Sequence, residues 1–203
     1  RPAPVAILGV PVALPLRADG VALSAEPGRH LAILGGAQRR GTAGVGTAGV
    51  GTAGGGNLAV GALQAAAISL AVQHPAGDAS FTLLDLLTPA EAGASGMEHL
   101  GWLLERLGFP LRVVAADDVD GEIRDVAARL SGPARTARKA RPAHYLLAPG
   151  LDRIGTADEP DETGGTTADA LRTLLTVGPV RHTHLLAWWS SIGVFRSHLG
   201  FAS

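Results

Sequence analysis

The sequence predicts an α/β fold with a mainly parallel β-sheet and helices on both of its faces. Short apolar runs alternate with Ala- and Leu-rich segments along the chain, which is the pattern of repeated strand–helix units. Apolar residues make up 46% of the chain and charged residues 17%, so the sequence has enough core-forming side chains to fold. At roughly 150 residues per domain, the 203 residues fit a single domain over 1–203.

The first segment, residues 1–29, predicts a lead-in hairpin. Residues 10–16 and 21–24 are short apolar runs, and the stretch Arg17-Ala-Asp-Gly20 between them contains the Asp-Gly pair typical of a tight turn. We therefore expect two short strands here, at an edge of the sheet.

The core elements follow in alternation. Residues 30–35 form an apolar run that ends in glycines, which is typical of a buried parallel strand. Residues 58–72 are apolar on nearly all sides and predict a largely buried helix with Asn57 as its N-cap. Asp117 or Asp118 is expected to cap a later helix. Further strands are expected over 81–86, 111–115, 144–148 and 184–189, and further helices over 97–107, 119–130 and 168–177.

Two stretches without an apolar period predict flexible loops, over residues 131–142 and 155–167. Cationic side chains cluster in the first of them, at Arg135, Arg138, Lys139 and Arg141. Such a local positive patch can contact DNA phosphates, although a solvated loop is the favoured interpretation. Lys139 is the only lysine in the chain.

Composition excludes several classes of protein. The chain has no cysteine, which rules out disulfide scaffolds, cysteine-based zinc sites, iron–sulfur clusters and thiol nucleophiles. Its net charge of -1 lacks the strong basic field of a self-sufficient nucleic-acid binder. No unbroken apolar stretch reaches about 18 residues, so we expect no direct membrane insertion. The start at Arg1 and the uncapped end over 193–203 indicate a piece of a longer protein.

The most distinctive motif is a glycine-rich repeat loop over residues 41–57. Gly-Thr-Ala-Gly-Val occurs twice and is followed by Gly-Thr-Ala-Gly-Gly. A glycine-rich loop between a core strand and a helix N-terminus is where α/β proteins bind phosphate, because backbone N–H groups and the helix dipole converge on the anion. A lengthened, flexible surface loop is the favoured alternative.

The dinucleotide fingerprint GxGxxG matches this loop in the registers that start at Gly44 and Gly49, with Asp85 as a candidate ribose acceptor. A repeat of this composition produces such matches automatically, so they carry little weight. The dinucleotide site remains an alternative for the loop.

The P-loop pattern GxxxxGK[ST] fits the repeat best in one register, which places it on Gly51, Gly54, Gly55, Gly56, Asn57 and Leu58. The pattern needs a lysine for the β- and γ-phosphates and a hydroxyl for magnesium, and Asn57 and Leu58 stand at those positions. Arg39 and Arg40 precede the loop and can contact an anion, but they do not reproduce P-loop geometry.

Four segments in order resemble the FtsK/SpoIIIE family of hexameric P-loop translocases, which includes the ATPase of type VII secretion. Residues 11–16 with 28–35 are similar to the family's lead-in hairpin and to the strand that runs into its Walker A loop. Residues 58–75 look like the helix after that loop, and residues 81–85 look like the next strand.

The third of these segments, residues 144–153, resembles the Walker B strand, in which an apolar run is followed by Asp-Glu. Pro149 and Gly150 replace that acidic pair here. Asp152 follows two to three residues too late for the magnesium-coordinating position, which favours a loop or capping role for it.

The fourth segment, residues 178–190, resembles the family segment that ends in Ala-Thr-Gln and senses the γ-phosphate. Trp188, Trp189 and Ser190 stand at those three positions. The phosphate lysine, the acidic pair and the sensor are therefore all altered, and these groups supply most of the charge stabilisation in phosphoryl transfer. The chain looks most like a divergent actinobacterial copy that has become a pseudo-ATPase.

The resemblance implies a RecA-like P-loop NTPase three-layer sandwich, C-terminally truncated in this chain. It also implies ATP and magnesium as ligands of the family, sibling ATPase domains or subunits in a ring, and DNA or secreted protein as cargo. The expected place is the cytoplasm, in a parent protein that can itself be membrane-anchored. The function expected is assembly, regulation or cargo docking in a DNA translocase or secretion protein. The alternative is a functional ATP- or dinucleotide-binding domain that uses the glycine-rich loop.

Two further features are discounted. His182 and His184 have the spacing of a metal pair on one face of a strand, but no third ligand is evident, so we expect no metal site and no catalytic residue. Trp102, Trp188 and Trp189 are more often core or interface residues than platforms for stacked bases.

Overall fold

The computed structural model describes residues 2–9, 19–35, 58–133, 142–154 and 165–199. Five parallel strands form its central sheet, in the order β3-β7-β6-β4-β5. They are β3 (Leu31–Leu34), β4 (Ala79–Asp85), β5 (Leu111–Ala115), β6 (Ala143–Pro149) and β7 (Thr183–Trp189). Strands β6 and β7 are apolar along most of their length because helices cover both faces of the sheet. The expected α/β architecture is confirmed.

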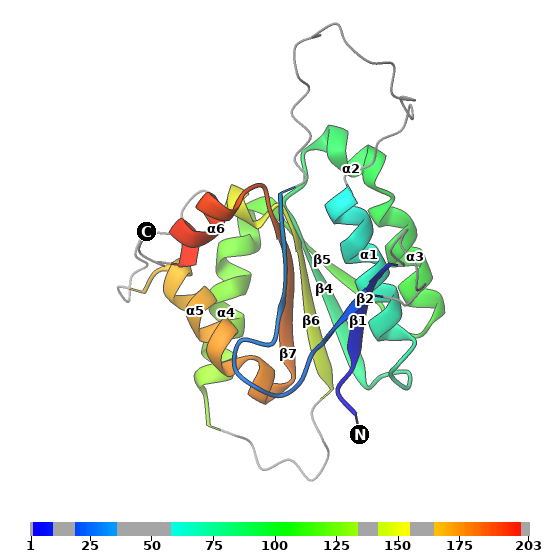
Figure 1. The fold of residues 1–203 in the computed structure, drawn as a ribbon, viewed down its shortest axis with the longest axis horizontal. Coiled ribbons are helices and arrows are strands. Elements are labelled where there is room, and N and C mark those ends of the chain that lie inside the picture. The colour runs from blue at the N-terminus through cyan, green and yellow to red at the C-terminus, as the bar shows by residue number, and fades with distance from the viewer. Residues whose placement is uncertain (1, 10–18, 36–57, 134–141, 155–164, 200–203) are drawn as a thin grey trace, which may run out of the picture.

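Helices lie on both faces of the sheet (Figure 1). One face carries α1 (Leu58–Ala71) and α3 (Met97–Arg106), and the other carries α4 (Val119–Ser131), α5 (Thr167–Val177) and α6 (Ile192–Leu199). The short helix α2 (Pro89–Ser95) follows β4. Single 3-10 turns are η1 (Ala116–Asp118), η2 (Leu151–Arg153) and η3 (Pro179–Arg181).

Each face of the sheet has its own hydrophobic core. Leu63 and Leu70 of α1 are fully buried against one face, where they pack with Tyr145. Ile123 of α4 and Leu171 of α5 are fully buried on the other face. Each such side chain contributes about 1.5–3 kcal/mol to folding.

A hairpin outside the main sheet explains why α1 is apolar on nearly all sides. β1 (Val5–Gly9) and β2 (Asp19–Ala22) pair antiparallel with each other and pack on α1. The N–H of Val5 donates to Oε1 of Gln73 and the N–H of Ile7 donates to Oγ of Ser69, both at 2.9 Å. The helix therefore lies between the sheet and this hairpin.

A hairpin forms within residues 1–29 as expected, but its predicted turn and its predicted place at an edge of the main sheet were wrong. Its first strand is Val5–Gly9, and Asp19 and Gly20 belong to β2 instead of the turn. The two strands form a separate sheet and are not an edge of the main one. Packing on α1 determines which residues become strand, and the local Asp-Gly signal carries no information about α1. Residues 10–18 lie outside the described residues.

Other differences are local. Helices α2 and α6 were not expected, although α2 has a full capping box between Thr88 and Glu91. Asp118 precedes α4 but makes no side-chain capping hydrogen bond, because the turn η1 leads directly into the helix. Ser131 and Thr167, expected in loops, belong to α4 and α5. The other predicted core elements match within a few residues.

Candidate functional site at the carboxyl edge of the sheet

Three neighbouring strands end together at one edge of the sheet. β3, β7 and β6 lie side by side and parallel, so the residues that follow them, Gly35, Ser190 and Gly150, lie at the same edge. The N–H of Gly35 donates to the carbonyl of Trp189 at 3.0 Å and continues the pairing past the strand ends. The carboxyl ends of parallel strands are where ligands bind in open α/β sheets.

The turn after β6 is built on Gly150. This residue has φ +80°, the left-handed region that a glycine adopts without strain. A Cβ at this position would lie 3.3 Å from the side chain of Arg153. The position that the resemblance assigns to a carboxylate therefore has a backbone that favours glycine and lies close to Arg153.

Asp152 and Ser190 are in direct contact. The hydroxyl of Ser190 donates to Oδ2 of Asp152, so the turn η2 after β6 is bound to the end of β7. The other carboxylate oxygen, Oδ1, is buried and has no hydrogen-bond partner in the described part of the chain. The structure thus brings together two residues that the sequence assigned to different motifs, and this contact could not be read from their spacing.

Arg153 is a cation at this edge, and its guanidinium makes three hydrogen bonds within the chain. Its guanidinium donates to the Glu91 carboxylate at 2.5 and 2.7 Å and to the carbonyl of Leu86 at 3.0 Å. Its central carbon lies 5.6 Å from the ring centre of Trp188, within range of a cation–π contact. The hydrogen bonds from Arg153 lower the pKa of Glu91 to about 2. Sequence reasoning missed both Arg153 and Glu91, although the capping-box spacing marks Glu91.

The two tryptophans that end β7 are core residues. Trp188 and Trp189 are 1% and 2% exposed, so neither presents a ring face to a nucleotide base. Nε1 of Trp188 donates to the carbonyl of Gly35 at 2.5 Å. Trp189 packs on the opposite face of the sheet, edge-on to Phe195 of α6.

Most of the expected Walker A positions lie outside the described residues. This applies to Gly51, Gly54, Gly55, Gly56 and Asn57, and Leu58 is the first residue of α1 with 86% of its surface exposed. The cations Arg39, Arg40 and Lys139 and the glycine registers at Gly44 and Gly49 also lie outside them.

The charged groups described at the carboxyl edge already make hydrogen bonds within the chain. The guanidinium of Arg153 is hydrogen-bonded to Glu91, and neither Pro149 nor Gly150 has a carboxylate. Asp152 accepts from the Ser190 hydroxyl, and Asp85, the last residue of β4, accepts from the N–H of Leu87 at 3.4 Å. A magnesium–nucleotide site uses magnesium ligands together with a cation on the phosphates.

The two histidines whose spacing resembles a metal pair lie in different settings. His182 is in the left-handed conformation before β7 begins, so it does not share a strand face with His184. Nδ1 of His184 lies 2.8 Å from the carbonyl of Arg29, and the ring stacks on Tyr145. Within the described ranges, no three histidine or acidic side chains group as metal ligands would.

The comparisons add no family. No protein-family model matches the chain, and a search of curated proteins found no match. None of the helices in the described ranges has the length and apolar character that crossing a membrane requires.

Proposed function

We propose that the chain is an FtsK/SpoIIIE-like ATPase-type module of a larger DNA translocase or secretion protein, and that it has lost hydrolysis. Its fold on this proposal is the RecA-like P-loop sandwich. Its role is assembly, regulation or cargo docking beside sibling ATPase domains in the cytoplasm, and its own ATP and magnesium chemistry is degenerate.

One observation carries this proposal. The strands assigned by resemblance to the Walker A loop, the sensor and the Walker B motif are β3, β7 and β6, and these three are immediate neighbours with a common direction. The resemblance rests on segments far apart in the sequence, and it requires their ends to meet at one nucleotide. Their adjacency supports the assignment.

The contacts at this edge support the loss of hydrolysis. Arg153 is neutralised by Glu91, and Asp152 is engaged by Ser190 on one oxygen. Gly150 has a left-handed backbone and a close neighbour in place of an acidic side chain. A nucleotide that used Arg153 or Asp152 would have to compete with these internal bonds.

Calorimetric titration with ATP, with and without magnesium, tests the proposal. The native chain is expected to show no magnesium-dependent binding, and the double variant Asn57→Lys/Leu58→Thr is expected to gain weak binding because it restores the phosphate lysine and the metal hydroxyl. Micromolar, magnesium-dependent binding by the native chain would favour the functional ATP-binding alternative. Binding of NAD or FAD with an affinity that does not depend on magnesium would favour the dinucleotide site.

A further inference from the structure

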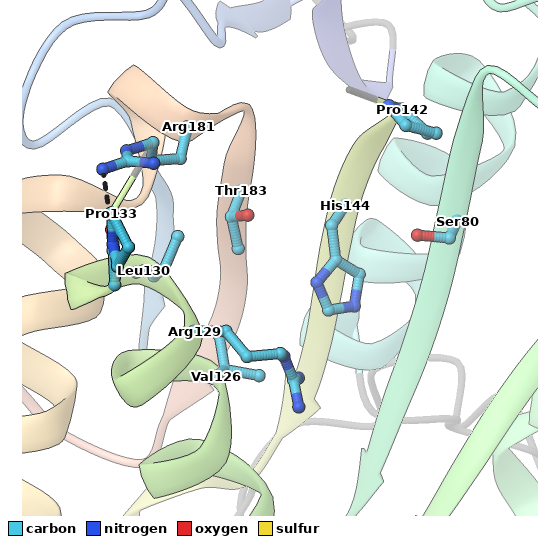
Figure 2. Close-up of a pocket in the computed structure, with 10 residues that line it drawn as sticks. Ser80, Val126, Arg129, Leu130, Pro133, Pro142, His144, Arg181 and Thr183 are labelled. Carbon is cyan, nitrogen blue, oxygen red and sulfur yellow. Dashed lines mark hydrogen bonds between the residues drawn. The ribbon is translucent and has the colours of Figure 1, made fainter. Parts of the chain in front are cut away.

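A pocket of about 620 Å³ opens at the amino edge of the sheet, the edge opposite to the site described above (Figure 2). It lies between the C-terminal part of α4 and the first residues of β4, β6 and β7. The residues that line it are Ser80, Val126, Arg129, Leu130, Gly132, Pro133, Pro142, His144, Arg181 and Thr183. This lining includes two arginines and no acidic residue.

Arg129 is a cation of the pocket lining that shares its ion-pair partner with a second arginine. Its ion-pair partner is Glu122, which it reaches through one nitrogen at 3.3 Å. Arg112 already holds both oxygens of the same carboxylate, at 2.9 and 2.7 Å. Two guanidiniums thus share the Glu122 carboxylate, and the charge of Asp125 also acts on Arg112. The Arg129 side chain is 57% exposed, so its remaining donors are accessible.

Arg181 supplies a second cation. It donates one N–H to the carbonyl of Gly132, at 3.2 Å, where α4 ends. A guanidinium has five N–H donors, so this contact leaves most of them available. No carboxylate of the described ranges forms an ion pair with Arg181.

The rest of the lining combines hydroxyls with apolar surface. Ser80 and Thr183 place hydroxyl groups at the amino ends of β4 and β7. The apolar walls are formed by Val126, Leu130, Pro133 and Pro142. Figure 2 shows the Arg129 side chain from α4 and the His144 ring from β6 beside this space. Burial, followed by the charge of Arg129, lowers the pKa of His144 to about 4, so this ring is neutral near pH 7.

We propose that this pocket binds a small organic oxyanion, a phosphate or carboxylate group attached to an apolar ring or chain. Arg129 and Arg181 supply the charge, as charge-assisted donors do for carboxylates and phosphates. The apolar walls contact the body of the ligand. This site lies apart from the carboxyl edge and does not depend on the function proposed above.

NMR titration of the ¹⁵N-labelled chain with three probes tests the site. Phenyl phosphate and benzoate represent the two headgroups, and benzyl alcohol is their neutral counterpart. We expect saturable shifts of the amides of Ser80, His144 and Thr183 with at least one of the two anions, and tenfold weaker binding of benzyl alcohol. The anion with the higher affinity identifies the headgroup. Failure of both anions to bind, or equal binding of the alcohol, would overturn the proposal.

Variants separate the charge from the cavity. Arg129→Gln and Arg181→Gln are each expected to weaken anion binding about tenfold, and Arg129→Lys is expected to retain part of it. Arg106→Gln is the matched control, because Arg106 is a cation of α3 on the other face of the sheet, in contact with Trp102. Glu122 keeps its two bonds to Arg112 when Arg129 changes. Unchanged affinity in both glutamine variants, with native melting temperatures, would refute the assignment.

Discussion

The guanidinium of Arg153 holds the carboxylate of Glu91 through two nitrogens, at 2.5 and 2.7 Å, and so connects the turn after β6 with the helix after β4. The two side chains are 32% and 31% exposed. They therefore exchange only part of their hydration for the pair, and a third bond, to the carbonyl of Leu86, fixes the arginine in place.

Arg153→Ala is expected to lower the free energy of unfolding by about 1–2 kcal/mol, because a bidentate pair and a backbone contact are lost. Glu91→Gln should cost less, about 1 kcal/mol, since partly exposed ion pairs contribute little. Urea denaturation of both single variants and of the double variant measures the coupling between the two side chains. Additive effects would contradict the contact.

The same pair makes stability depend on acid. Because the hydrogen bonds from Arg153 hold the pKa of Glu91 at about 2, below its ordinary value of 4.5, the folded state favours the ionised carboxylate. The stabilisation is complete above pH 4.5 and is lost as the pH falls toward 2. The difference in unfolding free energy between the native chain and Arg153→Ala should therefore shrink below about pH 4.5. A constant difference between pH 6 and pH 3 would be the opposite result.

Two glycine-to-alanine changes should have opposite signs. Gly150→Ala is expected to destabilise by about 1–2 kcal/mol, because the left-handed backbone at φ +80° disfavours a Cβ and Arg153 lies 3.3 Å from its position. Gly121→Ala in α4 is the control, since a Cβ there meets nothing within 4 Å. It should stabilise by about 0.5–1 kcal/mol through helix propensity. Thermal unfolding of the two variants compares them directly, and a loss of stability in both would contradict the argument.

Gly178→Ala is expected to destabilise the fold more than Gly150→Ala does. A Cβ at this position would lie 2.3 Å from the carbonyl oxygen of Leu174 and 2.7 Å from that of Thr183, and backbone atoms cannot move aside as a flexible side chain can. The connection between α5 and β7 would have to shift, at a cost of about 2–4 kcal/mol. A melting temperature within a degree of the native chain would show that the segment rearranges freely.

Protonation of the buried His30 should lower the stability of the fold in mild acid. Nδ1 of His30 accepts from the N–H of Leu185 at 2.8 Å and its Nε2 lies 3.1 Å from the carbonyl of Leu175, which fits a neutral ring. Burial, followed by the charge of His184, lowers the pKa of His30 to about 4 from 6.5. The stabilisation by the neutral His30 ring is therefore present above pH 6.5 and is lost as the pH falls toward 4. The complete loss would lower the free energy of unfolding by on the order of 3 kcal/mol.

The variant His30→Leu isolates this effect. It removes the titrating ring together with its two hydrogen bonds, so it should be less stable at pH 7.5 but should lose less stability than the native chain between pH 7.5 and pH 5. His144, whose pKa is also lowered to about 4, leaves a residual slope of the same sign. Parallel curves for the variant and the native chain would exclude His30 as a contributor.

Local patterns predicted most of the sheet and little of the site. A continuous apolar run such as residues 144–148 is typical of a parallel strand that is buried on both faces of the sheet. The composition of the run was therefore enough to predict a strand. The contact of Asp152 with Ser190 depends on β6 and β7 being neighbours, which no local spacing encodes. The partner of Arg153 could be found only after the helix that carries Glu91 was recognised.

The hairpin shows the same limit. Its strands were placed by a turn signal, whereas in the structure the first strand is Val5–Gly9, whose backbone is bound by Ser69 of α1 and by Gln73 just after that helix. Ser69 in α1 and Gln73 just after it carry no strand signal of their own in the sequence. They are the groups that satisfy the exposed backbone of a neighbouring strand.

Because β1 and β2 bond to each other and not to the five-stranded sheet, the hairpin can open without disturbing the sheet's hydrogen bonds. Amide protons of the hairpin should then exchange with solvent through a local opening of lower free energy than the one that exposes β6 and β7. The chain would contain two cooperative units, with the smaller one bound to the larger through α1. Changes on the outer surface of α1 would alter the exchange of the hairpin and leave the protection of the sheet intact.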